Sequence, residues 1–117
     1  MRYFNFEEFD SPDEPGSGHN MDDTFLEMLD EARAIAGVPF AITSGFRTPA
    51  HNRKVKGTKG SSHMQGLAAD IACADSYTRA IIVNALMDAG FMRIGIADTF
   101  IHCDCDTQKP EPRFWLY

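Results

Sequence analysis

The sequence lacks several features that would assign it to common classes of small protein. Its three cysteines, Cys73, Cys103 and Cys105, are odd in number and have no framework spacing, which argues against a disulfide scaffold. No apolar run approaches the roughly 20 residues needed to span a bilayer. The N-terminus has no apolar core of the kind found in signal peptides, so we expect synthesis and retention in a reducing cytoplasm. The chain also has no internal repeat.

Basic charge is scarce as well. The chain has 17 acidic and 11 basic residues, a net charge of −6. Binding to nucleic acid is therefore not expected, because phosphate contacts need clustered Lys and Arg. One basic cluster runs against this trend, and it is either a solvated loop or a rim that attracts an anionic substrate. It consists of Arg47, Arg53, Lys54, Lys56 and Lys59.

What is present is typical of one globular domain. The 117 residues are 44% hydrophobic and 24% charged, enough to bury a single core without disulfides. We therefore expect one domain over residues 1–117. The aromatic residues within 1–19 predict an N-terminal segment that docks on the body of the domain.

Apolar spacing predicts helices over 21–36, ended by Gly37, and from Ser76, as its cap, to Ala89. Residues 45–62 are rich in Gly, Lys, Ser and Thr and predict a loop with about one helical turn. Helices flanking short strands indicate an α+β fold with a small, mainly antiparallel sheet. The expected strands are 38–44, 66–73, 92–96 and 99–105, with the last five residues as a further strand or lid.

The segment "TFIHCDC" has a pattern that separates its polar side chains. Successive side chains of a strand point to opposite faces, so His102 and Asp104 share one face with Asp98. Cys103 and Cys105 face the other way. This pattern argues against a His/Cys metal cluster and predicts that the cysteines are small core residues.

A second segment, "SSHMQGLAAD", places His63 seven positions before Asp70. If its strand neighbours the strand of His102, two imidazoles and one carboxylate converge. That is the ligand set of a catalytic zinc with an open position for water. A single histidine beside a strand is more often an ordinary core or surface residue, so spacing alone leaves both interpretations open.

Three motifs together resemble one family. "SSHMQGLAAD" is similar to the Ser-x-His-x-x-Gly-x-Ala-x-Asp motif of the zinc D-alanyl-D-alanine carboxypeptidases, "SGFRTPAHN" to their Ser-Gly-Tyr-Arg segment, and "FIHCDC" to their His-x-Asp strand. The same family includes D-Ala-D-Ala dipeptidases and phage endolysins, and the hedgehog signalling domain shares its metal fold. The ending "KPEPRFWLY" resembles the short, single-domain members.

The resemblance implies one zinc ion held by His63, Asp70 and His102. Other divalent metals also suit this ligand set. It further implies that Arg47 holds a substrate carboxylate or polarises the scissile carbonyl, tasks that suit a planar guanidinium. Ser62 would orient either the first ligand or the substrate.

The general base is less directly implied. Thr99 stands where many relatives carry Glu or Asp three residues before the last ligand, and a threonine cannot serve as the base. We predict Asp104 as the base because the His-x-Asp pattern belongs to the short members. Asp98 is the alternative, since it lies nearer the usual offset.

The resemblance therefore implies a zinc peptidase that cuts peptidoglycan stem peptides at D-Ala-D-Ala or L-Ala-D-Glu bonds. Its partner would be the peptide substrate, with no membrane or nucleic acid, and we expect a monomer. Synthesis without a signal peptide would suit a phage enzyme released to the cell wall, or a cytoplasmic dipeptidase. Two alternatives remain: a catalytically weak zinc-binding module of the same fold, and an acidic structural protein without metal.

Overall fold

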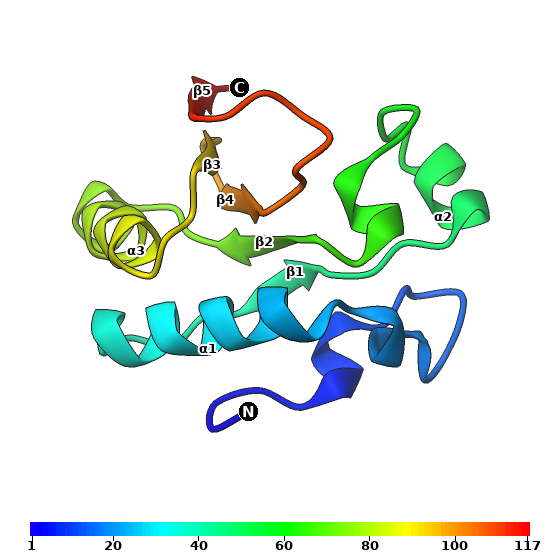
Figure 1. Ribbon diagram of the computed structural model, residues 1–117, viewed down its shortest axis with the longest axis horizontal. Coiled ribbons are helices and arrows are strands. Elements are labelled where there is room, and N and C mark those ends of the chain that lie inside the picture. Colours follow the sequence, from blue (N-terminus) through cyan, green and yellow to red (C-terminus); the bar gives the residue numbers. More distant parts are fainter.

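The computed structural model of the protein describes residues 1–117 and contains one five-stranded sheet surrounded by helices (Figure 1). The strand order is β1-β2-β4-β3-β5, and all neighbours are antiparallel except β3 and β5, which run parallel. The expected α+β class is confirmed. The strands are β1 (Ile42–Ser44), β2 (Ala68–Ala72), β3 (Arg93–Ile96), β4 (Phe100–Asp104) and β5 (Arg113–Leu116).

The first long helix, α1 (Asp23–Ala36), has clear signals at both ends. The Asp22 side chain accepts a hydrogen bond from the Phe25 amide at 2.9 Å, which satisfies one of the free amides of the first turn. Gly37 ends the helix in the left-handed conformation, with φ 68°. The helix therefore begins two residues later than predicted and ends where expected.

The second long helix, α3 (Ser76–Asp88), differs from the prediction at its cap. The capping residue is Asp75, whose carboxylate accepts the Thr78 amide at 2.9 Å, and Ser76 is the first helical residue. Aspartate and serine both cap well, and the carboxylate is the one that reaches this amide.

The core lies between these two helices and one face of the sheet. α1 contacts α3, and both helices contribute apolar side chains to one cluster with β2, β3 and β4. Alternate residues of the central strands point into it, so the residues between them face the opposite side. The completely buried members include Phe25, Leu29, Ile71, Ile82, Leu86, Ile94 and Ile101.

Two predicted segments differ in detail. The strand expected over 38–44 is limited to β1, and Pro39, which lacks an amide for a strand ladder, lies in the part that is not a strand. The segment 45–62 contains the short helix α2 (Pro49–Lys54) and the start of a 3-10 turn, η3 (Ser62–Gln65). No helix of the protein is long and apolar enough to cross a bilayer.

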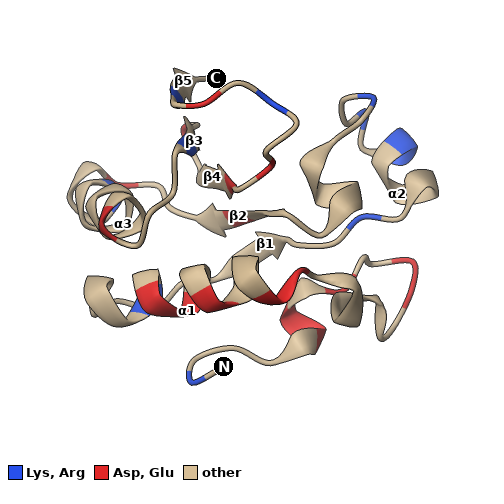
Figure 2. Ribbon diagram, in the orientation of Figure 1, with Lys and Arg blue, Asp and Glu red and all other residues tan.

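Charge is distributed unevenly over this fold. No acidic residue occurs between Glu31 and Asp70, a stretch that includes the whole basic cluster. Figure 2 shows acidic residues along α1 and the N-terminal segment, whereas α2 and its loops carry basic residues. The segment that contains α2 and the loop after it is therefore locally basic within an acidic protein.

The N-terminal segment includes the 3-10 turns η1 (Phe6–Phe9) and η2 (Ser17–Asn20), and Phe4 and Phe9 are buried in the core. Asp30 of α1 fastens the start of the chain. Its carboxylate accepts the amides of Arg2 at 3.1 Å and Tyr3 at 3.0 Å. Burial alone would raise the pKa of Asp30, but these amides and the Arg2 guanidinium lower it below its ordinary value.

We expect the substitution Asp30→Asn to lower the free energy of unfolding by about 1–2 kcal/mol at neutral pH, since hydrogen bonds to a charged acceptor are lost. The lowered pKa means that this stabilisation is present above pH 3.8 and disappears as the pH falls through the folded-state value. Urea unfolding at pH 7 and pH 3 would measure it. A difference between the two proteins that stays constant with pH would contradict the assignment.

Candidate metal centre

The sheet register brings two of the predicted ligands together. Asp70 in β2 lies directly opposite His102 in β4. Both face away from the helices, because the residues beside them, Ala69, Ile71 and Cys103, point into the core. The condition for convergence, that these two strands are neighbours, is therefore met.

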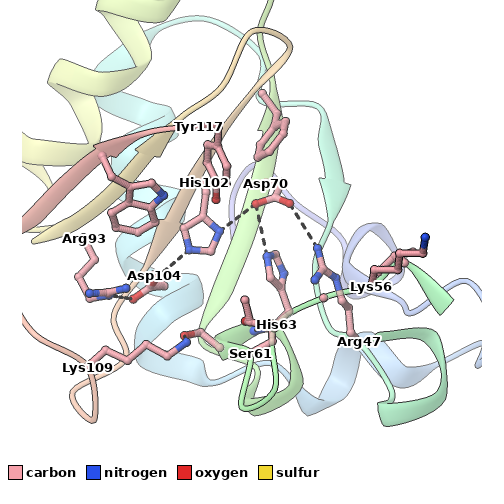
Figure 3. Close-up of a pocket in the computed structure, with 16 residues that line it drawn as sticks. Arg47, Lys56, Ser61, His63, Asp70, Arg93, His102, Asp104, Lys109 and Tyr117 are labelled. Carbon is pink, nitrogen blue, oxygen red and sulfur yellow. Dashed lines mark hydrogen bonds and ion pairs between the residues drawn. The ribbon is translucent and has the colours of Figure 1, made fainter. Parts of the chain in front are cut away.

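The third predicted ligand, His63, comes from the η3 turn beside β2. The Ser61 hydroxyl caps this turn by accepting the His63 amide at 3.2 Å, and Gly66 closes it with φ 70°. The Nδ1 atom of His63 lies 2.9 Å from the Gly45 carbonyl, which can only accept a hydrogen bond. Nδ1 therefore carries the proton, and Nε2 is the atom directed at Asp70 (Figure 3).

The ligand atoms converge on one carboxylate oxygen. Asp70 Oδ1 lies 3.3 Å from His63 Nε2 and 3.0 Å from His102 Nδ1. Ligand atoms bound at about 2.0–2.1 Å to a tetrahedral zinc are about 3.3 Å apart. When both imidazoles are neutral, three lone pairs face one point, an arrangement that a cation stabilises. The donor set therefore fits a divalent metal, and all three residues are buried.

Asp104 holds the other side of the His102 ring. Its Oδ2 atom accepts from His102 Nε2 at 2.7 Å, and its Oδ1 atom accepts from Arg93 Nε at 2.7 Å and from the Asp106 amide at 3.2 Å. A carboxylate on one ring nitrogen fixes the tautomer that leaves the other nitrogen free for a metal. In this geometry Asp104 orients His102, and both of its oxygens are occupied.

Arg47 makes the corresponding contact to the carboxylate ligand. Its Nη2 atom lies 3.6 Å from Asp70 Oδ2, while Nε donates to Ser44 at 3.1 Å and Nη1 to Asn52 at 3.3 Å. Its amide also donates to the His63 carbonyl at 3.2 Å. The structure thus places Arg47 against the ligand cluster, with its guanidinium fixed on three sides.

Electrostatics keep these carboxylates ionised. Burial would raise the pKa of Asp70, but when the facing nitrogens of His102 and His63 carry protons, in the absence of a metal, their hydrogen bonds lower it far below its usual range. Burial would also raise the pKa of Asp104, but the hydrogen bond from His102 outweighs burial and lowers the pKa of Asp104. Burial would lower the pKa of His102, whereas its two carboxylate partners raise it. The centre is thus a site of anionic and imidazole ligands.

The other sequence-predicted residues lie where their strand positions direct them. Cys103 belongs to the core and Cys105 packs against it, and burial raises the pKa of the Cys105 thiol to about 11. Cys73 is also a core residue. Asp98 is exposed in the turn between β3 and β4 and does not line the cavity described next.

A cavity of about 430 Å³ opens over the three predicted ligands. Four cationic side chains line it, and only two carboxylates, Asp70 and Asp104, do so. Ser62 lies on its wall, where the hydroxyl is 2.7 Å from both Asp106 Oδ2 and Lys109 Nζ. The cations are Arg47, Lys56, Arg93 and Lys109.

The aromatic wall of the cavity depends on a glycine. Trp115 of β5 lies with its ring centroid 5.5 Å from that of His102, and Tyr117 follows it along the same edge. A Cβ atom at Gly95 would come within 2.6 Å of Trp115 Nε1 and 2.8 Å of Tyr117 Cε2. Glycine at position 95 therefore lets the C-terminal strand close over the three predicted ligands.

Comparison with known proteins agrees with this geometry. A family model described as Peptidase M15 matches residues 4–104, which include every predicted ligand. The chain belongs to the peptidase M15 family. The resemblance to the zinc D-Ala-D-Ala carboxypeptidases is thereby confirmed, and the M15 fold agrees with the α+β architecture. No curated protein matches the chain.

For this M15 member, sequence reasoning missed three residues around the centre. Arg93 faces Asp104 across the hairpin, a pairing that follows from the register of β3 and β4 and was available from the strand prediction. Lys109 and Asp106 reach the site through a loop. Their contacts with Ser62, which is 47 positions from Lys109 and 44 from Asp106, carry no local sequence signal.

Proposed function

We propose that the protein is a zinc metallopeptidase that hydrolyses peptidoglycan stem peptides, of the D-Ala-D-Ala carboxypeptidase or L-Ala-D-Glu endopeptidase type. Membership of the M15 family supports a zinc peptidase in general. The observation that carries the proposal is the convergence of His63 Nε2, Asp70 Oδ1 and His102 Nδ1 at the base of an open cavity.

In this proposal His63, Asp70 and His102 hold the metal. A bound zinc would supply a Lewis acid and lower the pKa of a coordinated water to about 7. The Gly45 carbonyl keeps the Nδ1 proton on His63, and Asp104 keeps the Nε2 proton on His102. The guanidinium of Arg47 faces the same cavity and can stabilise negative charge that develops on the scissile carbonyl.

The proton acceptor is the least constrained part of the proposal. Of the two predicted bases, only Asp104 lines the cavity. To accept a proton from water, its Oδ2 atom would have to release or share the hydrogen bond with His102. The assignment of Asp104 as the base stays a prediction, and the substitution Asp104→Asn separates this role from the orienting one.

The substrate class is supported by charge. Stem peptides carry carboxylates, and the cavity has an excess of cationic side chains in a protein of net charge −6. The basic residues of α2 would favour approach to an anionic wall. We further propose that the protein reaches this wall by release from the cytoplasm, as in phage lysis.

A digest of purified peptidoglycan with zinc-loaded protein tests this function, with products identified by mass spectrometry. We expect new stem-peptide termini that disappear after chelation, return on reloading with zinc, and are absent with His63→Ala. The mass of the new termini identifies the bond that is cut. Termini that persist in the chelated protein would contradict a metal-dependent peptidase.

A second candidate is a zinc-binding module of the same fold that does not hydrolyse peptides. It is favoured by one observation, the complete occupation of the Asp104 carboxylate by His102, Arg93 and the Asp106 amide. Stoichiometric zinc in a protein that produces no new termini would support this candidate.

A further inference from the structure

We propose that Lys109 binds a carboxylate of the peptide substrate beside the metal ligands. This inference rests on the proposed peptidase function and adds a specificity-determining residue to it. Lys109 lies in the loop between β4 and β5, and its side chain reaches back to the turn that carries His63 (Figure 3). Its ammonium donates to the Ser62 hydroxyl at 2.7 Å, one residue before that ligand.

The loop holds this lysine in place. The buried Asp106 anchors the loop, since its amide donates to Asp104 and its carboxylate accepts the Gln108 amide at 3.0 Å. The same carboxylate accepts the Ser62 hydroxyl at 2.7 Å, so the serine offers its lone pair to the ammonium. Because a lysine fixed in this way has already lost part of its rotamer freedom, less entropy is lost when it binds a ligand.

The ammonium still has donors to offer. It carries three N–H groups, and Ser62 takes one of them. Asp106 Oδ2 is 3.8 Å away, so it forms an ion pair with the ammonium but lies beyond hydrogen-bonding distance. The Lys109 side chain is 31% exposed where it lines the cavity. Two donors therefore remain for a ligand that enters next to the metal centre.

The guanidinium groups of the two arginines of the cavity each face a carboxylate of the protein. Arg47 is held by Ser44, Asn52 and Asp70, as described above. Arg93 donates to Asp104 and, at 2.6 Å, to the Pro110 carbonyl. Lys56 lines the opposite side, beside Arg47, in an exposed loop (Figure 3). Lys109 is held in place by Ser62 and keeps two unpaired N–H groups, which suits it to recognise a carboxylate at a defined place.

Two parts of a stem peptide could supply that carboxylate: the C-terminus of the chain or an acidic side chain next to the scissile bond. Both offer the same chemistry to the ammonium, namely two acceptor oxygens and one negative charge. Paired peptides separate them. One pair differs only in a C-terminal acid or amide, and the other, amidated at the C-terminus, differs only in Glu or Gln.

The fluorescence of Trp115 reports binding without turnover, because Trp115 is the only tryptophan of the chain and lines the same cavity as Lys109. Each zinc-loaded protein would be titrated with both pairs of peptides, and hydrolysis of the same peptides would be followed separately. The proteins are the wild type, Lys109→Gln, Lys109→Arg, Lys56→Gln and Lys59→Gln. Lys109→Gln keeps a donor for Ser62 and loses the charge. Lys59→Gln makes the same change in an exposed residue outside the cavity.

We expect the wild type to prefer the acid of one pair by about 10-fold or more, the range of a charge-assisted hydrogen bond. Lys109→Gln should bind acid and amide alike within threefold, Lys109→Arg should recover part of the preference, and the other two variants should retain it. Zinc content should be equal in all variants. The pair that shows the preference identifies the source of the carboxylate.

A preference that persists in Lys109→Gln, or falls equally in Lys59→Gln or Lys56→Gln, would overturn the inference. If the peptides are hydrolysed and Lys109→Gln still prefers the acid, the inference about Lys109 is wrong but the proposed peptidase function stands. Carboxylate-dependent binding that Lys109→Gln abolishes, without hydrolysis of any peptide, would support the lysine site and contradict the peptidase. Neither binding nor hydrolysis would overturn both.

Discussion

Replacing Asp104 by asparagine is expected to weaken zinc binding by about 10- to 100-fold, the range found for outer partners of metal-bound histidines. The amide is similar in size and can still accept from His102, but it has lost the charge that holds the imidazole proton on Nε2. It also leaves the Arg93 guanidinium, only 11% exposed, without its counter-ion. Competition with a chromophoric chelator measures the affinity, and imidazole NMR reports the His102 tautomer.

The same variant tests the base. With zinc held at saturation, loss of a general base lowers turnover by about 100-fold or more. If turnover falls in this way while zinc affinity and the His102 tautomer are unchanged, Asp104 is the proton acceptor and its orienting role is contradicted. Asp98→Asn is the matched control, because it makes the same chemical change in the exposed turn. It also tests the other predicted base directly.

The substitution Arg47→Lys should lower turnover at saturating zinc by about 10²–10³-fold, the effect of removing one donor from an oxyanion site. A lysine keeps the charge but cannot contact Ser44, Asn52 and Asp70 together, because its ammonium is a single point on a flexible stem. Steady-state kinetics on the bond identified by the peptidoglycan digest would measure this loss.

Arg53→Lys in α2 is the control for Arg47→Lys, since Arg53 is exposed and outside the cavity. Turnover of Arg47→Lys within threefold of wild type would contradict a role for the guanidinium in the reaction. A fall in zinc affinity with normal turnover at saturation would instead limit Arg47 to holding Asp70.

Much of the metal centre could be predicted because its information is local or periodic. The alternation of "FIHCDC" separates His102 and Asp104 from the cysteines, and the structure places them on the two faces expected. The glycine after α1 marks the end of that helix at the predicted position. Both signals depend only on residues within a few positions of one another.

Other features depended on signals that were overlooked or on contacts that no local pattern contains. The short helix α2 has a capping threonine, Thr48, followed by proline at the first helical position, which is a recognisable helix start. The parallel pairing of β5 with β3 depends on the path of a loop. Lys109 reaches Ser62 only because that loop folds back through Asp106.

The direct opposition of Asp70 and His102 across β2 and β4 also bears on how the two strands are aligned. A slip of one residue would place Ala69 or Ile71 opposite His102 and turn a run of side chains to the wrong face. The small residues Ala68 and Ala69 do little by their size to oppose such a slip. A metal held by ligands from both strands would bind one alignment only, and it would therefore select the correct register as the sheet forms.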